Sequence, residues 1–143
     1  MRPTAALALS SLLLLAACAS LSGGTVAAAA QAISFDQSFT LKPGDSVVVG
    51  VERVTVAFDR VTADSRCPRD VQCIRAGDAT VLVGIAPTGQ PDGSVELKTT
   101  PRGATSTMGG FTLTLNELQP APRAAQPTQA SEYRATFVLS KAK

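Results

Sequence analysis

The sequence predicts one all-β domain over residues 33–143, either an antiparallel β-sandwich or a small Greek-key barrel of about seven strands. From residue 33 onward, apolar side chains alternate with polar ones at a spacing of two, which is the period of a half-buried strand. The apolar runs are rich in Val, Thr and Phe, and turn residues separate them. No segment in this region has the period of an amphipathic helix.

Three strands are expected in the first half of the domain: residues 33–41, 47–51 and 54–58. The first two are joined by Lys42-Pro43-Gly44-Asp45, which has Pro and Gly in the central positions of a type II turn. Val61 falls out of step with the alternation that precedes it. This slip predicts a β-bulge near Asp59-Arg60.

Four more strands are expected in the second half: residues 79–85, 95–99, 111–115 and 133–139. Two longer loops, Pro101–Gly110 and Pro120–Ser131, separate the last three strands. Apolar residues of period two from all parts of the domain should share one core. They are Phe35, Phe39, Val56, Phe58, Val83, Phe111, Leu113 and Phe137.

The composition argues against several classes of function. The chain has no His, no Trp and one Tyr. It therefore lacks the commonest general base and metal ligand, and it has few rings on which bases or sugars would stack. Loss of Arg2 alone from the 13 basic residues would leave 12 against 11 acidic ones, so no basic field attracts nucleic acid. We expect no catalytic residue, no metal or other cofactor, no enzyme activity and no nucleic-acid partner.

The N-terminal residues have the pattern of an export signal. Arg2 precedes an apolar run from Ala5 to Ala17, which is too short to cross a bilayer because a spanning helix needs about 20 residues. Leu15-Ala16-Ala17-Cys18 closes the run and resembles the lipobox of bacterial lipoproteins. Ala17-Cys18-Ala19 also fits, more loosely, the A-x-A end of an ordinary secretory signal.

The lipobox resemblance implies that residues 1–17 are a signal peptide and that Cys18 is the lipidated N-terminus. Diacylglycerol and a further acyl chain such as palmitate would anchor the protein stably, because two or more chains are needed for that. Ala19 follows the cysteine where inner-membrane lipoproteins tend to have Asp, which implies the outer membrane, facing the periplasm. Residues 18–32, rich in Ala, Ser and Gly, are expected to form a flexible tether; the alternative is a short helix through Ala27–Ala30.

Two cysteines remain once Cys18 is assigned to lipid. Cys67 and Cys73 lie close together in a chain expected to reach an oxidising compartment, so a disulfide between them is predicted. The chain does not supply the four ligands of a structural zinc site. A redox dithiol usually has two residues between its cysteines, whereas this pair has five.

The segment around these cysteines is the candidate recognition loop. Its candidate contact residues are Arg66, Arg69, Asp70 and Arg75. A loop made rigid by a disulfide loses less entropy on binding, and guanidinium groups suit carboxylate partners. The alternative is a stapled surface loop whose charges pair with one another.

Ser65-Arg66-Cys67-Pro68, followed by Cys73 and by Gly77-Asp78-Ala79, resembles a motif of small exported bacterial proteins of unassigned function. The resemblance covers roughly residues 54–85. It implies a β fold and a disulfide, and it implies no activity.

Three functions are consistent with these observations. The first is a membrane-anchored envelope lipoprotein that serves as a non-enzymatic binding or accessory module for another envelope protein. The second is an inhibitor of an envelope or extracellular hydrolase that acts through the Cys67–Cys73 loop. The third is a purely structural envelope lipoprotein. A protruding loop with Arg69 or another side chain fully exposed favours the inhibitor, and a loop lying against the sandwich favours a structural role.

Overall fold

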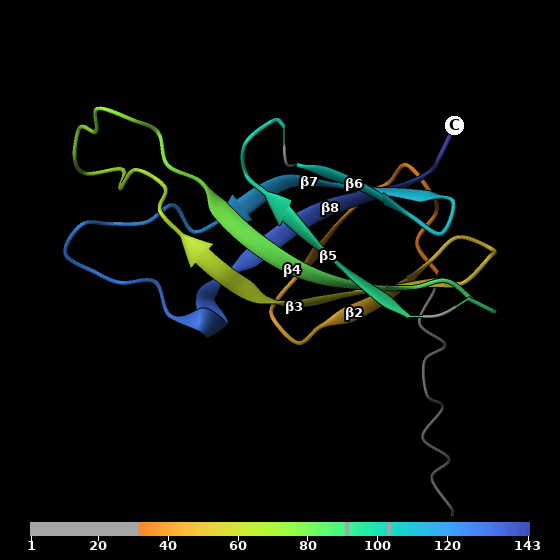
Figure 1. Cartoon of the computed structure of the whole chain (residues 1–143). Helices are drawn as coiled ribbons and strands as arrows, with labels where there is room; N and C mark the ends of the chain where they lie inside the picture. Colours follow the sequence, from red (N-terminus) through yellow and green to blue (C-terminus); the bar gives the residue numbers. More distant parts are fainter. Residues whose placement is uncertain (1–31, 91, 103) are drawn as a thin grey trace, which may run out of the picture.

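The computed structural model describes residues 32–90, 92–102 and 104–143. They form two antiparallel four-stranded sheets packed face to face as a β-sandwich (Figure 1). The predicted signal peptide, Cys18 and residues 18–31 of the predicted tether lie outside the described residues. No helix in the described part of the chain is long and apolar enough to cross a membrane.

The first sheet is a meander of consecutive strands in the order β2-β3-β4-β5. These strands are β2 (Ser46–Val49), β3 (Val54–Asp64), β4 (Ala79–Ala86) and β5 (Gly93–Lys98). The second sheet has the order β1-β8-β7-β6. Its strands are β1 (Ser38–Leu41), β8 (Arg134–Lys141), β7 (Phe111–Gln119) and β6 (Thr105–Met108), and a short 3-10 helix, η1 (Ala130–Glu132), precedes β8.

The core lies between the two sheets and is centred on aromatic contacts. Phe58 of β3 and Phe137 of β8 are fully buried and meet edge to face, with ring centroids 5.9 Å apart. Phe39 of β1 packs against Phe137 at 6.0 Å. The predicted core is confirmed for the buried residues Phe39, Val56, Phe58, Val83, Phe111, Leu113 and Phe137.

The predicted continuous strand over residues 33–41 is wrong. Asp36 has a φ of 64° and turns the chain, so the segment divides between the two sheets. Ile33 forms a bridge with Val49 of the first sheet, whereas β1 pairs with β8 of the second. Phe35 is therefore only half-buried, at the rim of the core, where its ring stacks on Phe111 at 5.7 Å. The prediction that Phe35 is buried with the other core residues is wrong for this reason.

The predicted bulge in β3 is confirmed. The pairing of β3 with β4 shifts register between Phe58 and Arg60, and again between Val61 and Ala63. The predicted turn before β2 is also present, because Gly44 has a φ of 88° and the Asp45 amide donates to the Lys42 carbonyl at 3.0 Å.

The structure has eight strands because the predicted loop Pro101–Gly110 contains β6. This strand lacks apolar alternation and is defined by its pairing with β7. The hydroxyl groups of Thr107 and Thr112 form a cross-strand hydrogen bond of 3.0 Å. Short polar edge strands of this kind leave little periodic signal in a sequence.

The two ends of the sandwich carry different segments (Figure 1). At one end, residues 65–78, hereafter the disulfide loop, join β3 to β4, and residues 120–129, hereafter the proline loop, follow β7. At the opposite end, Ala32, the turn Gly50–Arg53 and Lys141 line one hollow. The described chain therefore enters the domain at the end opposite the disulfide loop.

Candidate functional site

The disulfide loop extends beyond the ends of β3 and β4 (Figure 1). Cys67 and Cys73 are joined by a disulfide, as predicted, with their Cα atoms 5.9 Å apart. Two register shifts interrupt the pairing of β3 with β4 shortly before the loop begins, and the pairing resumes as far as Asp64 and Ala79. The cross-link closes a small ring near the tip, so the loop has less conformational freedom than an open connection of equal length.

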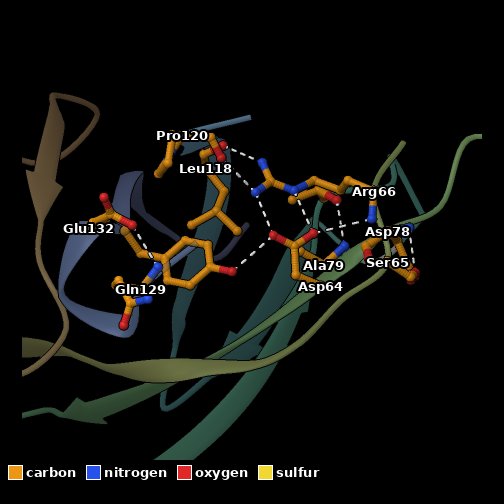
Figure 2. Close-up of polar contacts among 11 residues, drawn as sticks. Asp64, Ser65, Arg66, Asp78, Ala79, Leu118, Pro120, Gln129 and Glu132 are labelled. Carbon is orange, nitrogen blue, oxygen red and sulfur yellow. Dashed lines mark hydrogen bonds and ion pairs between the residues drawn. The ribbon is translucent and has the colours of Figure 1, made fainter. Parts of the chain in front are cut away.

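Hydrogen bonds across its base hold the loop together. The Ser65 amide donates to the Asp78 carbonyl at 2.7 Å, and the Asp78 amide donates to the Ser65 hydroxyl oxygen at 3.2 Å (Figure 2). Gly77 is required at this crossing because a Cβ atom there would lie 1.6 Å from the Ser65 carbonyl oxygen. Two backbone segments thus meet more closely than any side chain allows.

A group of three side chains, hereafter the clamp, ties this base to the second sheet. It consists of Asp64, Arg66 and Tyr133. Arg66 grips the Asp64 carboxylate with two bonds, from Nε at 2.9 Å and from Nη2 at 2.7 Å. The Tyr133 hydroxyl donates to the same carboxylate at 3.1 Å. The Arg66 and Asp64 side chains are only 15% and 10% exposed, so this ion pair is shielded from water.

Arg66 also reaches the end of β7. Its Nη1 donates to the Leu118 carbonyl at 2.5 Å and its Nη2 donates to the Pro120 carbonyl at 2.8 Å (Figure 2). One guanidinium group therefore connects the last residue of β3 with the start of the proline loop. Arg66 was a candidate recognition residue, and the structure places it inside the fold with its donors engaged.

The contacts within the clamp shift the pKa values of Asp64 and Tyr133. Burial by itself would raise the pKa of Asp64, but the hydrogen bonds and the positive charge of Arg66 outweigh it and hold that pKa below its usual value. Burial raises the pKa of Tyr133, and the negative charge of Asp64 raises it further. Asp64 is thus held as a carboxylate and Tyr133 as a neutral hydroxyl donor, which is the combination that the hydrogen bonds require.

The two loops at this end are bonded to each other. The Arg69 amide donates to the Pro122 carbonyl at 3.0 Å, and the Ala124 amide donates to the Asp70 carboxylate at 2.9 Å. Asp70, another candidate contact residue, therefore uses one carboxylate oxygen to hold the proline loop in place. The base and one flank of the disulfide loop are fixed by hydrogen bonds.

The tip of the loop, by contrast, faces solvent. Ile74, directly after the second cysteine, is fully exposed at 104%, and Val71 is 47% exposed. The candidate residues Arg69 and Arg75 are exposed as well. Ile74 was not among the candidate residues predicted from the sequence. Ile74 is a large apolar residue that lies next to an Arg and outside the period-two pattern. Since no strand face would bury such a residue, its position in the sequence could have indicated its exposure.

Within the described residues, no group of three or more Cys, Asp or Glu side chains has the geometry to hold a metal ion. No protein-family model, curated protein or solved structure matches the chain. The geometry of this end of the sandwich therefore provides the basis for a functional proposal.

Proposed function

We propose that this protein is a lipid-anchored bacterial envelope protein that binds another envelope protein through the tip of its disulfide loop and has no catalytic activity. The observation that carries the proposal is the exposure of Ile74 on a loop whose base is fixed. An exposed Ile, flanked by Arg75 and accompanied by Val71, combines an apolar anchor with a guanidinium fork. Binding hot spots are side chains that become fully desolvated in the interface, and Arg is enriched among them.

The fixed base favours binding because less entropy is lost when a rigid loop is immobilised. Asp64, Arg66 and Tyr133 restrain the loop on one side, and Asp70 restrains it on the other. A loop with a purely structural role would be expected to bury its apolar side chains against the sandwich. Ile74 is instead fully exposed to solvent, and its apolar surface would become buried only on contact with a partner.

The position of the loop suits a protein tethered by its N-terminus. Ala32 lies at the opposite end of the sandwich, beside Gly50–Arg53. If lipid is attached at Cys18, the tether joins the sandwich at the end away from the disulfide loop. The tether would then leave Ile74 unobstructed, so that a protein partner in the periplasm can reach it.

A second candidate function is inhibition of an envelope or extracellular hydrolase. The projecting, stapled loop favours it, because such a loop can enter an active-site cleft. Here Ile74 and Arg75 would occupy the cleft. The test is to add the purified protein, in increasing amounts, to a serine protease and to lysozyme. Stoichiometric loss of activity that Ile74→Asp abolishes would support inhibition, and unchanged activity would remove this candidate.

The proposed binding function is tested by affinity capture from envelope extract with the wild-type protein and three variants. Ile74→Asp places a charge at the loop tip and should abolish capture of the partner. Arg69→Ala should weaken capture and leave the melting temperature nearly unchanged, because an exposed charge contributes only about 0–1 kcal/mol to stability.

Val51→Asp is the matched control. Val51 is 92% exposed and lies at the opposite end of the sandwich, so its replacement makes the same chemical change away from the loop. The proposal requires that Val51→Asp captures the partner as the wild type does. Equal capture by the Ile74→Asp and Val51→Asp variants would exclude the loop tip as the contact surface.

A further inference from the structure

The disulfide loop and the proline loop border a hollow of about 340 Å³. Arg69 lines it from the disulfide loop and Arg123 lines it from the proline loop. Glu132, at the end of η1, lines it as well, together with Thr128, Pro120 and Pro127. The lining residues thus include two arginines and one glutamate, which give the hollow a formal charge of +1.

The backbone holds both arginines beside the hollow. Both chain neighbours of Arg123 are bonded to the disulfide loop. The Pro122 carbonyl accepts from the Arg69 amide, and the Ala124 amide donates to the Asp70 carboxylate. Arg123 is further fixed by a bridge to Gln126, whose amide donates to its carbonyl at 3.3 Å. Hydrogen bonds that do not involve their side chains therefore hold the backbones of both arginines beside the hollow.

Neither guanidinium group has a hydrogen-bond or ion-pair partner within the part of the chain that the structure describes. The Glu132 carboxylate accepts from the Gln129 amide at 2.6 Å, as the first turn of η1 requires (Figure 2). Two other cations of the first sheet and its loop do have anionic partners: Arg66 pairs with Asp64, and Lys98 pairs with Asp78. The arginines of the hollow differ from them in having no anion.

We propose that this hollow binds one carboxylate, supplied by the side chain of an acidic residue in the partner protein. A guanidinium fork matches the two oxygens of a carboxylate, and the bonds formed are charge-assisted. The charge of +1 complements a single negative charge, whereas the second charge of a phosphate would lie near Glu132. The site deepens the proposed function and rests on it, because the hollow borders the same disulfide loop.

The occupant comes from a protein rather than from the anchoring membrane because of where the hollow lies. It is at the end of the sandwich opposite Ala32, where the described chain begins. Its prolines offer apolar walls that suit the backbone and methylene groups of a peptide. The partner segment would therefore place an acidic side chain in the hollow beside its contact with Ile74.

The test uses the full chain, purified in detergent, and follows the Nε–H signals of its arginines by NMR. A blocked Ala-Glu-Ala tripeptide should shift the signals of Arg69 and Arg123 saturably. The Ala-Gln-Ala analogue should bind at least about tenfold more weakly, a factor that corresponds to about 1.4 kcal/mol. Inorganic phosphate should also bind more weakly than the glutamyl peptide.

Four variants locate the binding. Arg69→Gln and Arg123→Gln should each weaken binding of the glutamyl peptide by about tenfold, because each removes a charge-assisted hydrogen-bond donor. Arg60→Gln is the control, since Arg60 is exposed on β3 and does not line the hollow, and it should bind as the wild type does. Glu132→Gln keeps an oxygen for the Gln129 amide, removes the negative charge, and should tighten binding of both the peptide and phosphate.

Equal binding of the glutamyl and glutaminyl peptides would overturn the proposal, as would Arg69→Gln and Arg123→Gln variants that behave like Arg60→Gln. Phosphate binding as tightly as the glutamyl peptide would show a general anion site and would also overturn it. If the peptide fails while capture still depends on Ile74, only the carboxylate site is wrong. If the peptide binds while capture is independent of Ile74, the proposed contact surface is wrong.

Discussion

The clamp predicts that Arg66 contributes more to stability than the exposed ion pairs of this protein do. Arg66→Ala removes both bonds to Asp64 and leaves the carbonyls of Leu118 and Pro120 without their donor. Removing one partner of a buried pair typically costs 3–5 kcal/mol, and a pair that is 10–15% exposed belongs at the lower end. We expect the free energy of unfolding to fall by about 3 kcal/mol.

The assay is urea unfolding followed by far-ultraviolet circular dichroism. Lys98→Ala is the control, because Lys98 and Asp78 form an ion pair of 3.3 Å whose side chains are 50% and 31% exposed. That pair should contribute no more than about 1 kcal/mol. If Arg66→Ala lowers the free energy of unfolding no more than Lys98→Ala does, the clamp does not hold the loop base as argued.

The clamp also predicts how this stabilisation depends on pH. The pKa of Asp64 is lower in the folded protein than its ordinary value of 3.8, so the folded state binds the proton less well than the unfolded state does. The stabilisation by the Asp64 carboxylate is therefore present at pH values above 3.8. It is lost as the pH falls below 3.8 and through the lower pKa of Asp64 in the folded protein. The difference between wild type and Arg66→Ala should narrow in this acidic range. A difference that is constant down to about pH 2 would contradict the assignment.

Three other predictions follow from the packing and the sequence. Phe137→Ala should lower the free energy of unfolding by about 3–5 kcal/mol, because it empties the centre of the core; a loss below about 1 kcal/mol in urea unfolding would refute the core assignment. Gly77→Ala should cost about 1–3 kcal/mol in the same assay because its Cβ collides with the Ser65 carbonyl, whereas Gly84→Ala, whose Cβ would have its nearest neighbour at 3.7 Å, should be tolerated. Cys18→Ser should yield a product without acyl chains, and intact-mass analysis of the wild-type N-terminus should find lipid on Cys18; an unacylated Cys18 would contradict the predicted anchor.

The sequence predicted those parts of the fold that depend on local patterning. The period-two runs located seven strands, and the slip at Val61 located the bulge after Phe58. β6 escaped prediction because its Thr and Ser residues owe their strand geometry to pairing with β7. Phe35 was misplaced because the left-handed backbone of Asp36 interrupts an otherwise regular alternation.

The candidate site was predictable only in part. The spacing of the cysteines located the disulfide loop. The sequence could not show, however, that Arg66 and Asp70 bond within the fold whereas Arg69 and Arg75 are exposed. Arg66 binds carbonyls 52 and 54 residues away, and Asp70 binds an amide 54 residues away. Partners so distant in the sequence come together only when the two sheets pack against each other. The exposure of Ile74 was not predicted for a related reason, because it depends on where the loop projects.

The most direct test of the proposed contact surface is photo-crosslinking in living cells. A photoreactive amino acid would replace Ile74 in one variant and Val51 in another, so that both exposed ends of the sandwich are probed in the same way. We predict a discrete crosslinked product with one envelope protein from position 74 and none with that protein from position 51. Crosslinking of the same protein from position 51 alone, or no protein product from position 74, would contradict the account.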